Sequence, residues 1–463
     1  MKTFVLGVFA ALIVLSSLAL AQKQLPPEGG TPKDFVLPQK QEFKLPNGIA
    51  VTLIPFGEVP KVTINVVERC GNLNEKENQV WLADLTGEMM REGTSTRTAE
   101  QVAREAAGMG GNVNVNVNAD LTTISGDVLS EFGPQLMRLL GDLVLHPLFP
   151  ESELARIKND QLRQLSVSKT QPGNLALEEF RHMLYPDHPY GRVFPTQEMI
   201  EKYTIGDVRD FYKNNFGAQR TSIYVAGKFD SKAVEAAIRE TFSGWEKGPA
   251  IYVNVPKPVA KKAFGLVERT GAPQSTIYVG IPVLIPTDKD FLKMVVTNSL
   301  LGGSFASRIT SNIREKKGYT YSPFSQISTR YHDSYWVEIA DVGTEVTGPA
   351  LKEILGEVKR LAGEPPPEDE LKGIQNYMAG TYVLQNSTRQ GIIAQLSNLN
   401  LQGLPESYLM NYVKNVFAVT PEDVRHMTQK YLRADDMTLV IVGDKTKVEE
   451  QITDYAKPKP EEK

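Results

Sequence analysis

The chain has 463 residues, of which 41% are hydrophobic and 23% charged, as in ordinary globular proteins with cores of normal size. Its formal net charge is −4 and it has no long basic run, so nucleic-acid binding has no electrostatic support. The single cysteine, Cys70, excludes an internal disulfide. Because Cys70 follows an alternating strand pattern, we expect a buried structural thiol.

The N-terminus has the features of a secretory signal peptide. Lys2 precedes an almost wholly apolar run, and Ala-Leu-Ala at residues 19–21 forms a small-x-small cleavage site. The run is too short, and wrongly flanked, for a helix that spans a bilayer. We therefore expect residues 1–21 to be a signal peptide, with an uncleaved signal anchor as the alternative. Residues 22–41 are expected to form an extended leader, because they are rich in Pro, Gly and Lys.

Each half of the remaining sequence alternates strand and helix patterns. In the first half, residues 48–54, 61–67 and 221–225 have strand character, and residues 78–91 and 153–165 have apolar side chains at helical spacing. Thr98 and Thr204 have the spacing of capping residues at the start of two further helices. The mixture predicts an α+β fold. We expect α/β sandwich domains, each a mainly antiparallel sheet with helices packed on one face.

Residues 112–118 alternate strictly between asparagine and valine. In a strand, the three valines lie on one face, and Asn112, Asn114 and Asn116 lie on the other. A polar outer face is what an exposed edge strand needs against aggregation. The asparagines are therefore either polar cover or a surface that binds something else.

Three segments recur later in the chain at offsets of 217, 216 and 216 residues. The pairs are residues 150–154 and 367–371, 204–209 and 420–425, and 223–227 and 439–443. A near-constant offset predicts two homologous halves. We place the first domain at residues 42–256, a linker at 257–262, the second domain at 263–455 and a polar tail at 456–463.

The histidines are too scattered for a catalytic zinc site. They are His146, His182, His188, His332 and His426. A catalytic zinc needs three clustered protein ligands, often including two histidines one helical turn apart, and no pair here has that spacing. No nucleophile motif, glycine-rich phosphate loop or redox pair stands out. We expect no metal in this chain.

Several motifs, in chain order, resemble those of the pitrilysin/insulinase-type zinc peptidases. They are Gly93-Thr94, Gly110-Gly111, residues 300–308 and residues 313–321. The similarity covers about Glu42 to Tyr455, nearly all of the chain after the leader.

The resemblance implies that the zinc motif has been lost. In that family a His-x-x-Glu-His helix supplies two zinc ligands and the general base, and a downstream Glu supplies the third ligand. Anchored on the Gly-Thr pair after this helix, the two His positions fall at Asp84 and Glu88, the base at Gly87 and the third ligand at Gln164. Asp84 and Glu88 suit a catalytic zinc poorly, and we expect them to form a solvated helix face.

The second half does not replace the motif, because Met294, Thr297 and Asn298 occupy its positions. It does retain another family element. In active members, the half opposite the zinc contributes an Arg and a Tyr seven residues apart, and these match Arg314 and Tyr321. Such a pair can hold a substrate carbonyl and place a phenol beside a developing oxyanion. The alternative is a surface Arg and a core Tyr.

Some members of that family consist of two chains, one with the zinc motif and one with the Arg/Tyr pair. This chain resembles the second kind. It is expected to be a non-catalytic, substrate-binding subunit of an exported zinc metallopeptidase that acts on unfolded peptides. Zinc would lie in a homologous partner that carries His-x-x-Glu-His. In the family the strand at residues 112–118 takes up substrate as an added strand, which would make Asn112, Asn114 and Asn116 substrate-binding residues.

Two other functions stay open on the sequence. One is a catalytically silent scaffold or assembly protein of the same fold, and the other is a peptidase with an unusual site of its own. Export without disulfides favours a periplasm-like compartment, with secretion as the alternative. A homodimer is also left open, and the sequence names neither the peptide nor the cleavage preference.

Overall fold

The computed structural model describes residues 35–456. The signal peptide predicted at residues 1–21, most of the leader and nearly all of the polar tail lie outside the described residues. The described end of the leader contacts the second half: the ring of Phe35 meets that of Tyr382 edge-on at 5.4 Å, and Lys40 forms an ion pair of 2.6 Å with Glu406. In this described part, no helix has the length and apolar character needed to cross a membrane.

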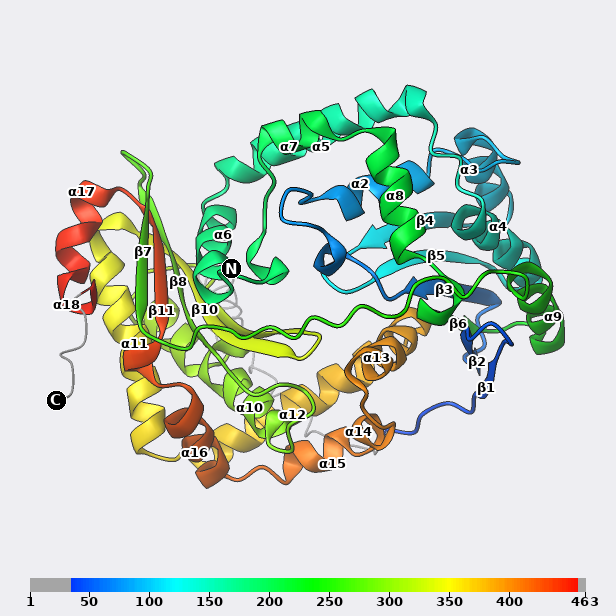
Figure 1. The fold of residues 1–463 in the computed structure, drawn as a ribbon. Helices are drawn as coiled ribbons and strands as arrows, with labels where there is room; N and C mark the ends of the chain where they lie inside the picture. Colours follow the sequence, from blue (N-terminus) through cyan, green and yellow to red (C-terminus); the bar gives the residue numbers. More distant parts are fainter. Residues whose placement is uncertain (1–34, 457–463) are drawn as a thin grey trace, which may run out of the picture. The chain divides into compact units, whose positions relative to one another are not determined.

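The described residues build two sheets with the same strand order (Figure 1). The first has six strands in the order β1-β2-β6-β3-β5-β4, and the second has five in the order β7-β11-β8-β10-β9. The strands of the first sheet are β1 (Gln41–Lys44), β2 (Ala50–Pro55), β3 (Lys61–Glu68), β4 (Asn112–Val117), β5 (Thr122–Leu129) and β6 (Thr221–Gly227). Those of the second are β7 (Ala263–Glu268), β8 (Gln274–Pro282), β9 (Phe324–Arg330), β10 (Asp333–Gly343) and β11 (Thr438–Gly443).

Both sheets are mainly antiparallel, as predicted. The parallel pairs are β2 with β6 and β7 with β11, which occupy equivalent places in the two sheets. Leaving out β1, each strand of the first sheet has a counterpart at the same place in the second. The repeated strand order agrees with the repeated sequence segments.

Helices from the same half cover one face of each sheet. On the first sheet these are α2 (Leu82–Met90), α3 (Ala99–Gly108), α4 (Gly133–Leu145), α8 (Ile205–Asn215) and α9 (Ser231–Phe242), with α5 (Glu151–Thr170) and α7 (Gln197–Lys202) beside them. On the second they are α10 (Phe291–Asn298), α11 (Thr347–Gly363), α12 (Glu368–Gln385) and α16 (Pro421–Tyr431), with α14 (Ser407–Met410), α15 (Tyr412–Phe417), α17 (Lys445–Val448) and α18 (Thr453–Ala456) completing the half. Both predicted capping boxes are present, Thr98 with Gln101 and Thr204 with Asp207. The predicted fold class is confirmed.

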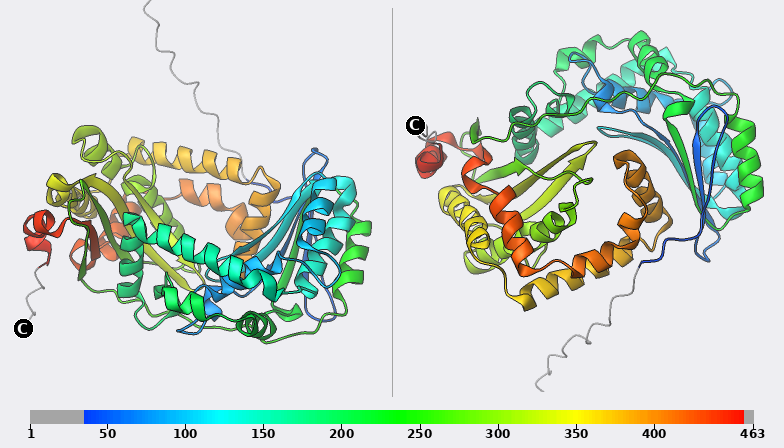
Figure 2. Two further views of the ribbon diagram at one scale, coloured as in Figure 1. Left: turned by 90° about the horizontal axis from the view of Figure 1, so that it is seen from above. Right: turned by 60° about the horizontal axis from the view of Figure 1, so that its bottom comes forward.

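The other face of each sheet is covered by a helix from the opposite half, which the sequence analysis did not foresee. Helix α6 (Pro172–Leu184) packs on β8 and β11 of the second sheet, where the ring of Phe180 lies 5.5 Å from that of Tyr335. Helix α13 (Arg389–Gln402) packs on β3 and β6 of the first sheet (Figure 2). The two helices start 217 residues apart, the same offset as the sequence repeat. The halves therefore exchange equivalent helices and share their cores.

Cys70 is fully buried beside Thr122, with 3.7 Å between the Sγ and Oγ1 atoms. Burial raises the pKa of its thiol, and the nearby Glu68 carboxyl raises it further. The predicted structural thiol is confirmed.

Candidate functional site

The helix that holds the zinc-motif positions starts later than predicted. We expected it to begin at residue 78, but α2 begins at Leu82 because Trp81 adopts a left-handed conformation, with φ of +68°. The indole Nε1 of Trp81 donates a hydrogen bond of 3.1 Å to the carbonyl of Val193, and its ring packs edge-on against Phe194. These contacts hold the side chain in place and make the unusual backbone conformation tolerable.

The expectation that Asp84 and Glu88 lie on a solvated helix face is wrong. No residue between Leu82 and Met90 is exposed, and both carboxyl groups are half-buried. The reason lies in the tertiary structure, because β4, α5 and α8 pack around α2. A polar pattern that suits an exposed helix face is instead held inside the first half.

Asp84 belongs to a cluster of carboxyl groups that includes Glu75, a residue the sequence did not single out. The Asn72 Nδ2 atom donates to Asp84 Oδ2 at 2.7 Å and to Glu75 Oε1 at 3.1 Å. Glu75 Oε1 also accepts a bond of 2.8 Å from the backbone amide of Ala83. One amide side chain thus joins two carboxyl groups that sit beside the start of α2.

Burial raises the pKa of all three carboxyl groups near α2. It raises the pKa of Asp84 to about 6, and the hydrogen bond from Asn72 acts in the opposite direction. The pKa of Glu75 is raised to about 8 and that of Glu88 to about 7, in each case first by burial and then by repulsion from Asp84. The cluster therefore takes up protons close to neutral pH.

The residues at the motif positions do not fit a zinc site. Gly87 has no side chain to act as a base, and a Cβ atom there would lie 2.8 Å from Val117 Cγ2 and 3.3 Å from Val115 Cγ1 on β4. Gln164 is exposed on α5. Within residues 35–456, no group of three or more His, Cys, Asp or Glu side chains could hold a metal ion.

Arg314 and Tyr321 are brought together at the surface of the second half. Arg314 lies in the π-helical segment Thr310–Lys316, and its guanidinium stands 5.0 Å from the ring centre of Tyr321 and 4.4 Å from that of Phe305. Tyr321 is 81% exposed and Phe305 is 70% exposed. Gly318, with φ of +65°, allows the chain to turn between Arg314 and Tyr321. Tyr321 is therefore not a core residue, and its exposed ring is available to a partner or a ligand.

The asparagine strand forms an edge of the first sheet, as predicted. Among the described strands, β4 pairs with β5 alone. Asn112, Asn114 and Asn116 are exposed, and the valines between them are half-buried. Asn114 Nδ2 lies 3.3 Å from Asn112 Oδ1. This geometry leaves the outer edge of β4 open to an added strand, but it serves equally as polar cover.

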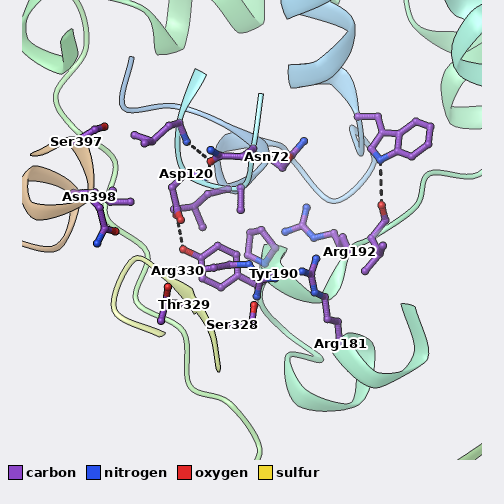
Figure 3. A pocket seen from close by; sticks show the side chains of 18 of the residues that line it. Asn72, Asp120, Arg181, Tyr190, Arg192, Ser328, Thr329, Arg330, Ser397 and Asn398 are labelled. Atoms are coloured by element: carbon purple, nitrogen blue, oxygen red, sulfur yellow. Dashed lines mark hydrogen bonds between the residues drawn. The ribbon is translucent and has the colours of Figure 1, made fainter. Parts of the chain in front are cut away.

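A cavity of about 570 Å³, which no pattern in the sequence indicated, is lined by residues from both halves of the chain (Figure 3). Three arginines line it: Arg181 on α6, Arg192 just beyond that helix, and Arg330 at the end of β9. We call this the arginine cavity. Its other polar lining side chains are Asn72, Asn118, Asp120, Tyr190, Ser328, Thr329, Ser397 and Asn398. Neither Arg314 nor Tyr321 is among its lining residues.

Asp120 joins the two halves at the wall of the arginine cavity. Its Oδ1 atom accepts a hydrogen bond of 2.5 Å from the hydroxyl of Tyr190, and its Oδ2 atom accepts one of 3.2 Å from the backbone amide of Tyr331.

Two histidines nearby are not metal ligands of one site: His182 is exposed, whereas His188 is buried and bonds to the backbone of Tyr190 and Asn254.

The structure has two similar sheets, and the residues at its zinc-motif positions do not fit a zinc site. Together these features define a class of protein, a peptidase-like fold that has lost the residues of its metal site. Comparison with known proteins identifies the class more closely. The family described as "Insulinase (Peptidase family M16)" matches residues 56–193, and the family described as "Peptidase M16 inactive domain" matches residues 202–378. The chain belongs to the pitrilysin/insulinase-type M16 family, as an inactive member.

Bacterial relatives match over most of the chain. An "uncharacterized zinc protease YmxG" of Bacillus subtilis is 24% identical over 411 residues, which cover 87% of this chain and 98% of that protein. A "non-peptidase homolog YmxG" of Helicobacter pylori is 22% identical over 399 residues, covering 85% and 90%. The crystal structure of a peptidase M16 inactive domain from Pseudomonas fluorescens has a TM-score of 0.80 at 25% identity, covering 88% of this chain and 98% of that one. A Helicobacter pylori protease, with a TM-score of 0.82 and 18% identity over 88% and 100%, shares the fold.

Proposed function

We propose that this protein is a non-catalytic, substrate-binding subunit of an exported zinc metallopeptidase. The observation that supports this proposal is that the zinc-motif residues are lost whereas the Arg/Tyr pair is kept. The zinc-motif positions hold Asp84, Gly87, Glu88 and Gln164. Arg314 and Tyr321 are retained and lie together, with the ring of Tyr321 exposed. Arg314 also forms an ion pair of 3.2 Å with the neighbouring Glu315, and the exposed ring of Tyr321 beside it can serve a ligand or another chain.

In this proposal the chain positions the peptide and the partner supplies the zinc, which activates water when bound there. The Arg314 guanidinium would donate to the carbonyl oxygen of the bound peptide, and the Tyr321 hydroxyl would donate to the oxyanion as it develops. The stacking of Arg314 over the Tyr321 ring supports this role, because it holds the cation and the phenol side by side. The open edge of β4 would take up the peptide backbone through Asn112, Asn114 and Asn116.

The first experiment is to isolate the protein from its source with whatever it binds. We expect a chain of similar size that carries His-x-x-Glu-His. The pair is then assayed on an unstructured fluorogenic peptide with Tyr321→Phe and Arg314→Ala, and with Tyr377→Phe, which changes another exposed tyrosine, as the control. We expect each site variant to lower turnover by about 10²–10³-fold, since removal of one such donor has this effect. Full activity of the double variant would overturn the cross-chain role.

A scaffold role is the second candidate, and the exchanged helices favour it because they give a rigid two-sheet body without need of a ligand. The two functions differ in peptide binding by the chain alone. Saturable binding that is lost with Arg314→Ala supports the substrate-binding subunit. A complex that assembles normally while no peptide binds to it supports the scaffold.

A further inference from the structure

The arginine cavity carries an excess of positive charge that the surrounding side chains do not neutralise. Arg181, Arg192 and Arg330 line it, and the carboxylate among its lining residues is Asp120. Asp120 already accepts hydrogen bonds from the Tyr190 hydroxyl and the Tyr331 amide. Among the described residues, none of the three arginines has a hydrogen-bonded carboxylate partner.

Arg330 is the most confined of the three. It is 7% exposed, and within residues 35–456 its Nη1 atom has no hydrogen-bond partner. The nearest carboxylate, that of Asp333, stands 3.9 Å from Nη1 and already accepts a bond of 2.5 Å from the Tyr185 hydroxyl. The guanidinium also lies over the ring of Tyr190 at 5.0 Å, so an aromatic face and one carboxylate beyond hydrogen-bond distance surround it. A buried cation with a free donor is costly unless an anion reaches it.

Arg181 approaches the same region from α6. Its Nε atom lies 3.5 Å from the hydroxyl of Tyr335, and Arg330 stacks on the same ring at 5.7 Å. Burial lowers the pKa of Arg181, and repulsion from Arg330 lowers it further. Arg192 reaches the cavity beside Arg181 (Figure 3), and its Nη1 atom donates to the carbonyl of Glu75 at 3.2 Å. Two half-buried guanidinium groups and one buried one therefore converge, and the carboxylate within 4 Å of any of them is that of Asp333, 3.9 Å from Arg330 Nη1.

The lining of the arginine cavity suggests which anion fits. Guanidinium groups bind carboxylates through two parallel hydrogen bonds, which planar groups at the cavity wall can form. The amide and hydroxyl side chains of Asn72, Asn118, Ser328 and Asn398 can pair with peptide groups. A volume of about 570 Å³ is within the range of pockets that hold small ligands, and it accommodates the last few residues of a peptide rather than a folded chain.

We propose that the arginine cavity binds the C-terminal carboxylate of a peptide between the two halves of this chain. That the ligand is a peptide rests on the proposed function, but binding at the arginine cavity requires neither the partner subunit nor the partner's zinc. It also lies apart from the Arg314 and Tyr321 pair, so the two sites are tested separately.

The test uses the mature full-length chain and one labelled unstructured peptide in three forms: with a free C-terminus, with a C-terminal amide, and with a C-terminal amide plus one internal Glu. Fluorescence anisotropy gives the three dissociation constants. We expect the free acid to bind roughly 10–100-fold more tightly than either amide, since a charge-assisted bidentate pair has about this effect. Equal binding of the free acid and the plain amide would overturn the proposal. Preference for the internal Glu over the free C-terminus would also overturn it.

Variants then locate the preference. Arg330→Gln and Arg192→Gln should each remove most of the advantage of the free acid, and Arg192 is the safer of the two because its side chain is half-buried rather than buried. Arg138→Gln is the matched control, since this exposed arginine pairs with Glu240 away from the cavity. Inorganic phosphate should compete with the free acid at millimolar concentration. An undiminished preference in well-folded Arg192→Gln and Arg330→Gln proteins would place the carboxylate elsewhere.

The outcome is independent of the proposed catalytic role. Arg314→Ala and Tyr321→Phe, which the proposed function places in peptide binding, should weaken binding of the free acid and of the plain amide by the same factor, so that the ratio of the two dissociation constants is unchanged. A chain that keeps this preference while the same variants have no effect on the paired enzyme would refute the cross-chain role and retain the carboxylate site.

Discussion

Gly87 on α2 and Val117 on β4 lie so close that a Cβ atom on Gly87 would stand 2.8 Å from Val117 Cγ2. Val115 occupies the adjacent space, 3.3 Å from the same position. In the family that this chain resembles, the general base occupies the position of Gly87. Here the valines of β4 fill that space, so α2 packs directly against the edge of the sheet at this position.

This contact predicts that Gly87→Ala destabilises the protein, although alanine is the better helix former. The added methyl group meets two β-branched side chains, and we expect the free energy of unfolding to fall by about 1–3 kcal/mol. Gly108→Ala on α3 is the matched control, because a Cβ atom there has no neighbour within 4 Å. It should be neutral or stabilise by up to about 1 kcal/mol. Denaturant unfolding measures both, and equal effects would contradict the close packing at Gly87.

The carboxyl cluster predicts a pH dependence of stability centred on Glu75. Burial, aided by Asp84, raises the pKa of Glu75 from 4.5 to about 8, so the folded protein holds a proton that the unfolded chain releases near pH 4.5. The stabilisation is therefore complete below pH 4.5 and is lost as the pH rises toward 8. Glu75→Gln keeps an acceptor for Ala83 and Asn72 but cannot ionise.

Between pH 4.5 and 8.5 we expect the free energy of unfolding of Glu75→Gln to gain roughly 2–4 kcal/mol relative to the unaltered protein, since one pKa unit corresponds to about 1.4 kcal/mol. Glu77→Gln, at an exposed position in the same loop, should show no such trend. Urea unfolding over this pH range is the measurement. Parallel pH profiles for Glu75→Gln and the unaltered protein would rule out the raised pKa.

The exchanged helices predict that damage to α6 weakens the second sheet. Phe180 is fully buried between Tyr278 and Tyr335 although it belongs to the first half of the sequence. Phe180→Ala should lower the free energy of unfolding by about 3–5 kcal/mol, because it leaves a cavity in a shared core. Val167→Ala on α5, which is 62% exposed, should stay within about 0.5 kcal/mol. Hydrogen exchange of the backbone amides in β8 and β11 should be faster in Phe180→Ala than in the unaltered protein. An increase in exchange that is confined to the first half would contradict a shared core.

The equivalent helix α13 is held to the first sheet by a charged contact. Arg389 Nη2 donates to Asp127 Oδ2 at 2.8 Å, and Lys61 Nζ donates to Asp127 Oδ1 at 2.7 Å. Burial acts to raise the pKa of Asp127, but the hydrogen bonds from Lys61, Thr63 and Arg389 together lower it. The stabilisation is thus present above the ordinary pKa of an aspartate and is lost as the pH falls below it.

We expect Arg389→Ala to cost about 1 kcal/mol at pH 7, a modest value because both partners remain partly exposed to solvent. The cost should shrink below about pH 4, the ordinary pKa of an aspartate, because the unfolded chain then takes up a proton at Asp127 before the folded protein does. Arg138→Ala, which removes a more exposed ion pair with Glu240, is the control and should have less effect. A cost that is the same at pH 3 and pH 7 would show that Arg389 stabilises by packing alone.

The sequence by itself determined the class of fold, the internal duplication and the capping residues Thr98 and Thr204. These features depend on local periodicity and on hydrogen bonds within one turn of a helix, and a repeated offset is visible without coordinates. It also determined that the residue types at the zinc-motif positions cannot form the family's metal site.

The start of α2 and the burial of Asp84 and Glu88 were decided by tertiary contacts. The indole of Trp81 reaches Val193, and β4, α5 and α8 enclose a helix whose sequence looks amphipathic. No short-range pattern records how many sides of a helix its neighbours cover.

The exchange of α6 and α13 and the arginine cavity also belong to the tertiary structure. Arg181 and Arg330 come from different halves, and their meeting depends on α6 crossing to the second sheet. A sequence pattern reports which face of a helix is apolar, but not which of two similar sheets will bury it. The choice rests on the packing of Phe180 and its neighbours against one particular set of strands.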